Sequence, residues 1–84
     1  MSACAAQVFI GITREKFTCL QGKAAEQGIA IDDDQGTVSK DGVTGTWNFD
    51  SASQTLTIQC TSSPFFLGCG TINGAIHNFV DSCS

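Results

Sequence analysis

Five cysteines are the residues of this chain whose chemistry is most versatile. They are Cys4, Cys19, Cys60, Cys69 and Cys83. No two have the CxxC spacing of thioredoxin-like sites, and the single histidine lacks the second histidine that a zinc finger needs. We therefore expect no metal site and no cofactor. The sequence favours small buried thiols in a reducing cytoplasm; one or two disulfides in an exported form, with its leader removed, are the alternative.

Cys69 is the candidate for a reactive thiol. It stands between Gly68 and Gly70, just before a predicted helix, and a helix N-terminus favours the thiolate form. His77 and Asp81 are four residues apart on that helix, so the carboxylate would be able to orient the imidazole. Cys69, however, precedes His77 by about 12 Å of continuous helix. No catalytic set is predicted.

The acidic run Asp32 to Asp34, followed by Gly36, has a superficial likeness to a calcium loop. Such a loop needs alternating carboxylates and a glutamate at its twelfth position, and no glutamate follows Glu26. Three adjacent like charges resist burial. We therefore expect this run to form a solvated turn.

Composition limits the classes of function. The 84 residues have room for a single small domain, residues 1–84, and 42% of them are hydrophobic, which is typical of a folding chain. Eight acidic and four basic side chains give a net charge of −4, too few cations for the basic stripe that nucleic-acid binding requires. No apolar run approaches the ~20 residues of a membrane-spanning helix. We expect neither a nucleic-acid partner nor a membrane span.

The N-terminal half reads as a strand followed by a helix. Residues 6–13 alternate, which predicts a half-buried strand with Val8, Ile10 and their even-numbered neighbours facing inward. Thr13 is placed to cap a helix over residues 14–27, and Gly28 is placed to end it. Residues 29–31 read as a short strand.

The C-terminal half reads as a meander and a second helix. Asp41-Gly42 is the composition that a type I′ hairpin turn requires, and residues 43–49 and 55–61 alternate on either side of a second turn. This alternation turns Trp47 and Phe49 inward. Thr71 is placed to cap an amphipathic helix, and its apolar stripe comprises Ile72, Ala75, Ile76, Phe79, Val80 and Cys83. We predict an α+β two-layer sandwich of order β-α-β-β-β-α, or with one further strand, in which two helices cover one face of an antiparallel sheet of about four strands.

Exposed aromatic side chains are the candidates for partner binding. Phe9 falls on the outer face of the first predicted strand, and the triplet Phe65, Phe66 and Leu67 is too apolar for all three side chains to enter one core. A hydrophobic staple at the entry to the last helix is the alternative for the triplet. A contact surface here would serve a protein partner or self-association.

The run GVTGTWNFDSASQTLTIQCTSSPFF, followed by GTINGAIHNFV and preceded by a TREKF helix start and a GIAI exit, resembles a group of short, uncharacterised bacterial proteins. They share a strand-helix beginning, a Trp-x-aromatic-Asp hairpin, an LTI strand and a Pro-aromatic segment before the last helix. The resemblance covers nearly the whole chain and implies no catalytic residue. The five cysteines depart from it.

These observations favour a small acidic non-catalytic domain that acts through its surface, as a protein-interaction or accessory module. A thiol-based redox or cysteine-dependent function centred on Cys69 is the alternative.

Overall fold

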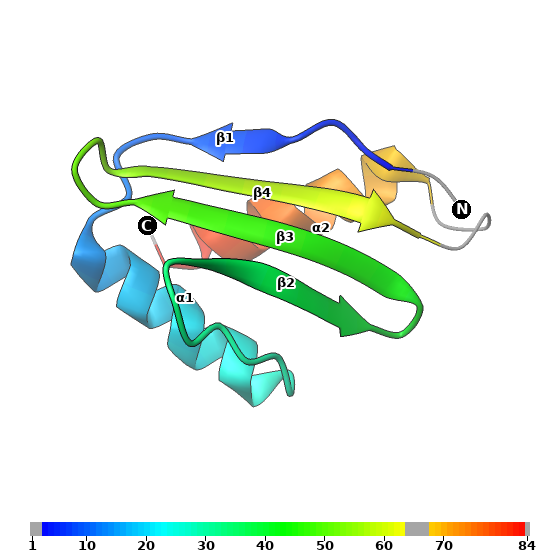
Figure 1. Cartoon of the computed structure of the whole chain (residues 1–84), viewed down its shortest axis with the longest axis horizontal. Helices are drawn as coiled ribbons and strands as arrows, with labels where there is room; N and C mark the ends of the chain where they lie inside the picture. The colour runs from blue at the N-terminus through cyan, green and yellow to red at the C-terminus, as the bar shows by residue number, and fades with distance from the viewer. Residues whose placement is uncertain (1–2, 64–67, 84) are drawn as a thin grey trace.

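The computed structural model of the chain describes residues 3–63 and 68–83. Its elements are β1 (Gln7–Phe9), α1 (Arg14–Glu26), β2 (Gln35–Lys40), β3 (Val43–Asp50), β4 (Thr55–Ser62) and α2 (Cys69–Asp81). The strands form an antiparallel sheet in the order β1-β4-β3-β2, and both helices lie on the same side of it (Figure 1). The predicted α+β sandwich and its β-α-β-β-β-α order are confirmed.

Helix α1 has the boundaries that its capping residues predict, to within one residue. The Thr13 hydroxyl accepts a hydrogen bond of 3.2 Å from the backbone N–H of Lys16. Gly28 follows the helix with a φ of +77°, a conformation that glycine adopts without strain. Phe17, Leu20 and Ala24 lie one turn apart and are buried against the sheet. The helix is therefore fixed by local caps at both ends and by one apolar face.

The β2–β3 hairpin turns at Asp41 and Gly42, whose φ angles are +54° and +83°. Both central residues of a type I′ turn need a positive φ, so the predicted turn is confirmed. The turn sets the alternation of β3, because it pairs Lys40 with Val43. Trp47 and Phe49 consequently face the helices, with exposed fractions of 8% and 3%.

The predicted register of the first strand is wrong. Val8 and Ile10, which were expected to face inward, are 62% and 81% exposed, whereas Phe9 packs against the core. The strand is only three residues long, and Gly11, with a φ of +74°, interrupts the alternation before the buried Ile12. A left-handed residue shifts the side chains that follow it to the other face. Phe9, which is larger than Val8 and Ile10, takes the inward position in β1, and Ile12 takes the next one after Gly11.

Two further boundaries differ from prediction. Residues 29–31 do not form a strand: this irregular segment is attached to α1, whose Ala24 carbonyl accepts from the Ile29 N–H at 2.9 Å and whose Gln21 amide donates to the Ile31 carbonyl at 2.8 Å. Helix α2 begins at Cys69 with Gly68 as its N-cap, three residues before the expected N-cap at Thr71. For residues 29–31, the hydrogen bonds to α1 outweigh the local strand pattern.

Two disulfides replace most of the expected free thiols. Cys4 is bonded to Cys69 and Cys19 to Cys83, with Cα–Cα distances of 5.5 and 6.0 Å. All five cysteines lie in the described ranges, and Cys60 is the one left free. The first bond joins the chain before β1 to the start of α2, and the second joins α1 to the residues just after α2. Helix α2 is therefore tethered covalently at both ends.

Candidate functional site

An apolar groove separates α2 from α1 on the inner face of the sheet. The helices lie close together near the C-terminus of α2 and diverge toward its N-terminus (Figure 1). The groove has a volume of about 480 Å³. Its polar lining residues are Thr46, Gln59, Lys40 and Asp41, and the others are apolar: Ala24, Ile29, Ile31, Val38, Val43, Gly45, Trp47, Ile58, Cys60, Ile72, Ala75, Ile76 and Phe79.

The α2 wall of the groove is an apolar stripe that the protein buries only in part. The sequence predicted this stripe as the inward face of the helix. Val80, near the C-terminus of α2, is 5% exposed, whereas Ile72, Ile76 and Phe79 are half-buried and line the groove. The apolar surface thus extends beyond what the domain itself covers.

Trp47 forms a fixed part of the floor. Its indole N–H donates a 2.8 Å hydrogen bond to the Asp33 carbonyl, and its ring lies against Gly36 of the neighbouring strand. A Cβ atom on Gly36 would come within 2.7 Å of the ring, so the absence of a side chain there is what makes room for it. The indole is held on one edge by a hydrogen bond and on one face by close packing.

Charged groups occur only at the hairpin end of this groove. Among the described residues that line it, Lys40 carries the one positive charge and Asp41 the one negative charge. The Lys40 ammonium donates a hydrogen bond to the carbonyl of Gln27, the C-cap residue of α1. Lys40 therefore reaches from the end of β2 to the end of α1.

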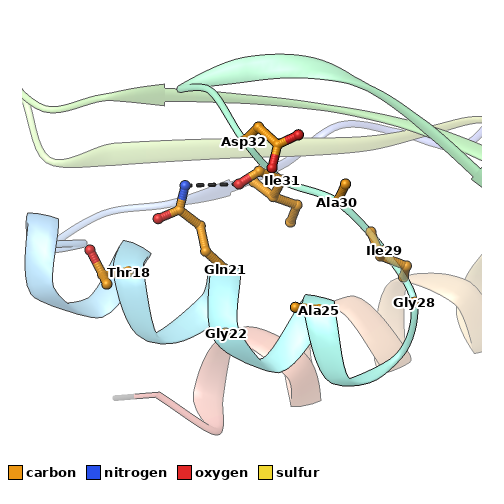
Figure 2. Close-up of a pocket in the computed structure, with 9 residues that line it drawn as sticks. All are labelled: Thr18, Gln21, Gly22, Ala25, Gly28, Ile29, Ala30, Ile31 and Asp32. Carbon is orange, nitrogen blue, oxygen red and sulfur yellow. Dashed lines mark hydrogen bonds between the residues drawn. The ribbon is translucent and has the colours of Figure 1, made fainter.

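A second hollow, of about 640 Å³, lies on the other side of residues 28–32, next to α1. Figure 2 shows small side chains around it, together with the Gln21 amide that bonds the Ile31 carbonyl. Ile29 and Ile31 line both this hollow and the apolar groove, so residues 28–32 form the partition between them. Its small and mixed lining offers a ligand less apolar contact than the groove does.

The predicted reactive thiol is not a thiol in this structure, because the sulfur of Cys69 is bonded to Cys4. The free thiol belongs to Cys60, which is 2% exposed and donates a 3.4 Å hydrogen bond to the Ser62 carbonyl. Its inward position in β4 follows the predicted alternation. What the sequence did not reveal is that Cys60 would line the apolar groove.

His77 is an exposed residue of α2 whose side chain contacts strand β1. Its Nε2 atom lies 2.9 Å from Oε1 of Gln7, and its ring packs edge-on against Phe9 at 5.0 Å between centroids. This contact brings α2 and β1 together. Within residues 3–63 and 68–83, no group of three His, Cys, Asp or Glu side chains is placed to hold a metal ion.

The partner-binding candidates fall in two regions. Phe9 is half-buried and packs against the core, on the face opposite to the predicted one. Phe65, Phe66 and Leu67 lie outside the described residues. The exposed large apolar side chains of the described part are Val8 and Ile10, at or next to the edge strand β1.

The acidic run does more than form a solvated turn. The Arg14 guanidinium makes a bidentate ion pair with Asp34, at 2.7 and 3.0 Å, and its hydrogen bond lowers the pKa of that carboxyl. The Asp34 carbonyl also accepts a hydrogen bond from the backbone N–H of Phe49. These contacts anchor the chain that enters β2 to both α1 and β3.

Comparison with known proteins gave no match to a family model, a curated protein or a solved structure. Neither described helix has the length and apolar character needed to cross a membrane. The geometry of the groove is therefore the basis on which a function is proposed.

Proposed function

We propose that this protein is a non-catalytic binding domain that holds an apolar ligand in the groove between α2 and α1, on the inner face of the sheet. The observation that carries the proposal is the groove itself. Its volume of about 480 Å³ falls within the roughly 300–1,000 Å³ of small-molecule sites, and its lining is predominantly apolar, as in such sites.

The energetic argument rests on the partly covered stripe of α2. Apolar surface gains about 25 cal/mol for each Å² removed from water. Ile72, Ile76 and Phe79 keep part of that surface facing the sheet across the groove. A ligand that fills the space would bury both walls and the floor at once.

Rigidity of the walls supports the same function. The disulfides tether both ends of α2, and Trp47 is fixed in the floor by its hydrogen bond to Asp33. Walls that do not have to be ordered when the ligand binds lower the entropic cost of binding. Polar groups that would position a reacting atom are few along the groove, which favours binding over catalysis.

The two disulfides also support an oxidising compartment for this domain, in place of the reducing cytoplasm favoured by the sequence. Disulfides persist in exported proteins and are rare in the cytosol. We therefore propose an exported binding module. An interaction with a protein partner would use the same apolar groove, filled by side chains of that partner.

A neutral, environment-sensitive dye tests the proposal. Nile red should bind the wild-type protein with a rise in fluorescence. Ala75→Phe would place a large side chain in the groove and should weaken binding at least tenfold. Ala25→Phe is the matched control, because Ala25 is also an exposed helical alanine but lines the second hollow.

Circular dichroism of each variant establishes that it is folded. Equal dye affinities for the two variants, or no dye binding by the wild-type protein, would contradict the proposal. Backbone amide shifts on titration locate the bound dye independently: they should concentrate in α2 and in β3, around Trp47.

A further inference from the structure

We infer that the ligand of the groove is an amphiphile with one anionic end, of the class of free long-chain carboxylates, and that Lys40 binds its headgroup. This inference rests on the proposed function. It adds a chemical class and an orientation: the hydrocarbon chain lies along α2, and the carboxylate lies at the β2–β3 hairpin.

The distribution of charged side chains sets the orientation of the ligand. The walls that α2 and residues 29–31 contribute are apolar, and the charged side chains stand together at the hairpin end. A charged group cannot enter an apolar site without a partner, because its desolvation is uncompensated. The polar end of an amphiphile must therefore lie at the hairpin, where water and Lys40 are both available.

The position of Lys40 makes it, of the two charged residues that line the groove, the partner for the headgroup of the ligand. Its side chain crosses from β2 to α1, where its ammonium bonds the Gln27 carbonyl close to Gly28. An ammonium has three donors, so two remain for a ligand. A carboxylate is a stronger acceptor for this ammonium than a neutral carbonyl, because both partners of the hydrogen bond are then ionised.

Asp41 weakens the attraction of Lys40 for a carboxylate without reversing it. Asp41 stands in the two-residue turn, whereas the Lys40 side chain reaches from β2 to the Gln27 carbonyl at the end of α1. Both side chains are exposed, so water screens both charges. An anion near Lys40 is repelled by Asp41, so removal of that carboxylate should strengthen carboxylate binding. An amine would show the opposite dependence.

Three ligands with the same ten-carbon chain test the inference by calorimetry at low ionic strength and neutral pH: decanoate, decan-1-ol and decylamine. Because both partners are ionised only in the bond to the carboxylate, decanoate should bind about five- to tenfold more tightly than the alcohol. Lys40→Met should remove that advantage and leave alcohol binding within about twofold. Lys40→Arg should keep it, and Asp41→Asn should increase decanoate affinity by about twofold.

Lys23→Met is the control, because it makes the same change in net charge on α1 at a residue that does not line the groove. Equal losses for Lys23→Met and Lys40→Met, or tightest binding of decylamine, would overturn the inference and leave the proposed function standing. Failure of all three ligands to bind would overturn both.

Discussion

Gly36 and Gly22 offer a matched pair of substitutions with opposite expected effects on stability. A Cβ on Gly36 would lie 2.7 Å from two atoms of the Trp47 ring, well inside the ~3.5–4.0 Å of favourable carbon contacts. The ring is buried and its indole N–H is bonded to Asp33, so it cannot withdraw without loss. A Cβ on Gly22, in the middle of α1, would meet nothing within 4 Å.

Gly36→Ala should therefore lower the free energy of unfolding by about 1–2 kcal/mol, the usual cost of overpacking less the entropy gained by replacing glycine. Gly22→Ala should raise it by up to about 1 kcal/mol, the difference in helix propensity. Urea unfolding followed by the fluorescence of Trp47, the only tryptophan, measures both.

The two variants should differ by about 2 kcal/mol, more than tenfold in the folding equilibrium. The Gly36→Ala protein should also bind Nile red more weakly, because the displaced indole forms part of the floor of the groove. A midpoint for Gly36→Ala at or above that of the wild-type protein would refute the proposed packing of Trp47 on Gly36.

Three other predictions concern the disulfides, the free thiol and the ion pair. Replacing both Cys19 and Cys83 by serine should lower the free energy of unfolding by about 4 kcal/mol, because the bond closes a loop of 64 residues in the unfolded chain. An unchanged melting temperature in calorimetry would contradict this prediction. Under non-reducing conditions, iodoacetamide should leave the folded protein unmodified, because Cys60 is buried, and should alkylate Cys60 alone after unfolding in urea. Mass spectrometry counts the alkyl groups, and a second alkylated cysteine would contradict the disulfide pairing. The lowered pKa of Asp34 contributes stability that is present above the pKa of this carboxyl in the unfolded chain and is lost as the pH falls through its pKa in the folded protein. Arg14→Gln should therefore move the NMR titration midpoint of Asp34 upward, and an unmoved midpoint would contradict the ion pair as the cause of the shift.

Local patterns predicted those parts of the fold that local interactions determine. The Asp41-Gly42 turn and the Thr13 cap each depend on residues within four positions, and both formed as expected. The register of β3 follows directly from the turn, so the inward position of Trp47 was also predictable. Short-range chemistry was sufficient for these elements.

The register of β1 was not predictable by the same reasoning. The alternation of Val8 and Ile10 suggested one face, but Gly11 adopts a left-handed conformation and Phe9 finds its neighbours on α2. Residues 29–31 likewise have the composition of a strand but bond to α1. The contacts that decide the register of β1 come from a helix distant in the sequence, and those of residues 29–31 come from the side chain and C-terminal carbonyl of the preceding helix.

Disulfide pairing depends on the same long-range placement. Cys4 and Cys69 are 65 residues apart, and Cys19 and Cys83 are 64 apart. Their Cα atoms come within bonding range only because the helices lie on one face of the sheet. The composition left disulfides open as an alternative, and only the tertiary structure selects the pairs.

The groove and the disulfides have a common physical basis. A chain of 84 residues buries a smaller share of its surface than a larger domain does, and it usually needs all of its apolar contacts to remain folded. Two cross-links that each close a loop of about 65 residues contribute on the order of 4 kcal/mol apiece by constraining the unfolded chain. That contribution does not require α2 to close against α1. The apolar stripe of α2 is therefore free to face an open groove, and the covalent tethers that stabilise the domain also fix α2, one wall of its proposed binding site, at both ends.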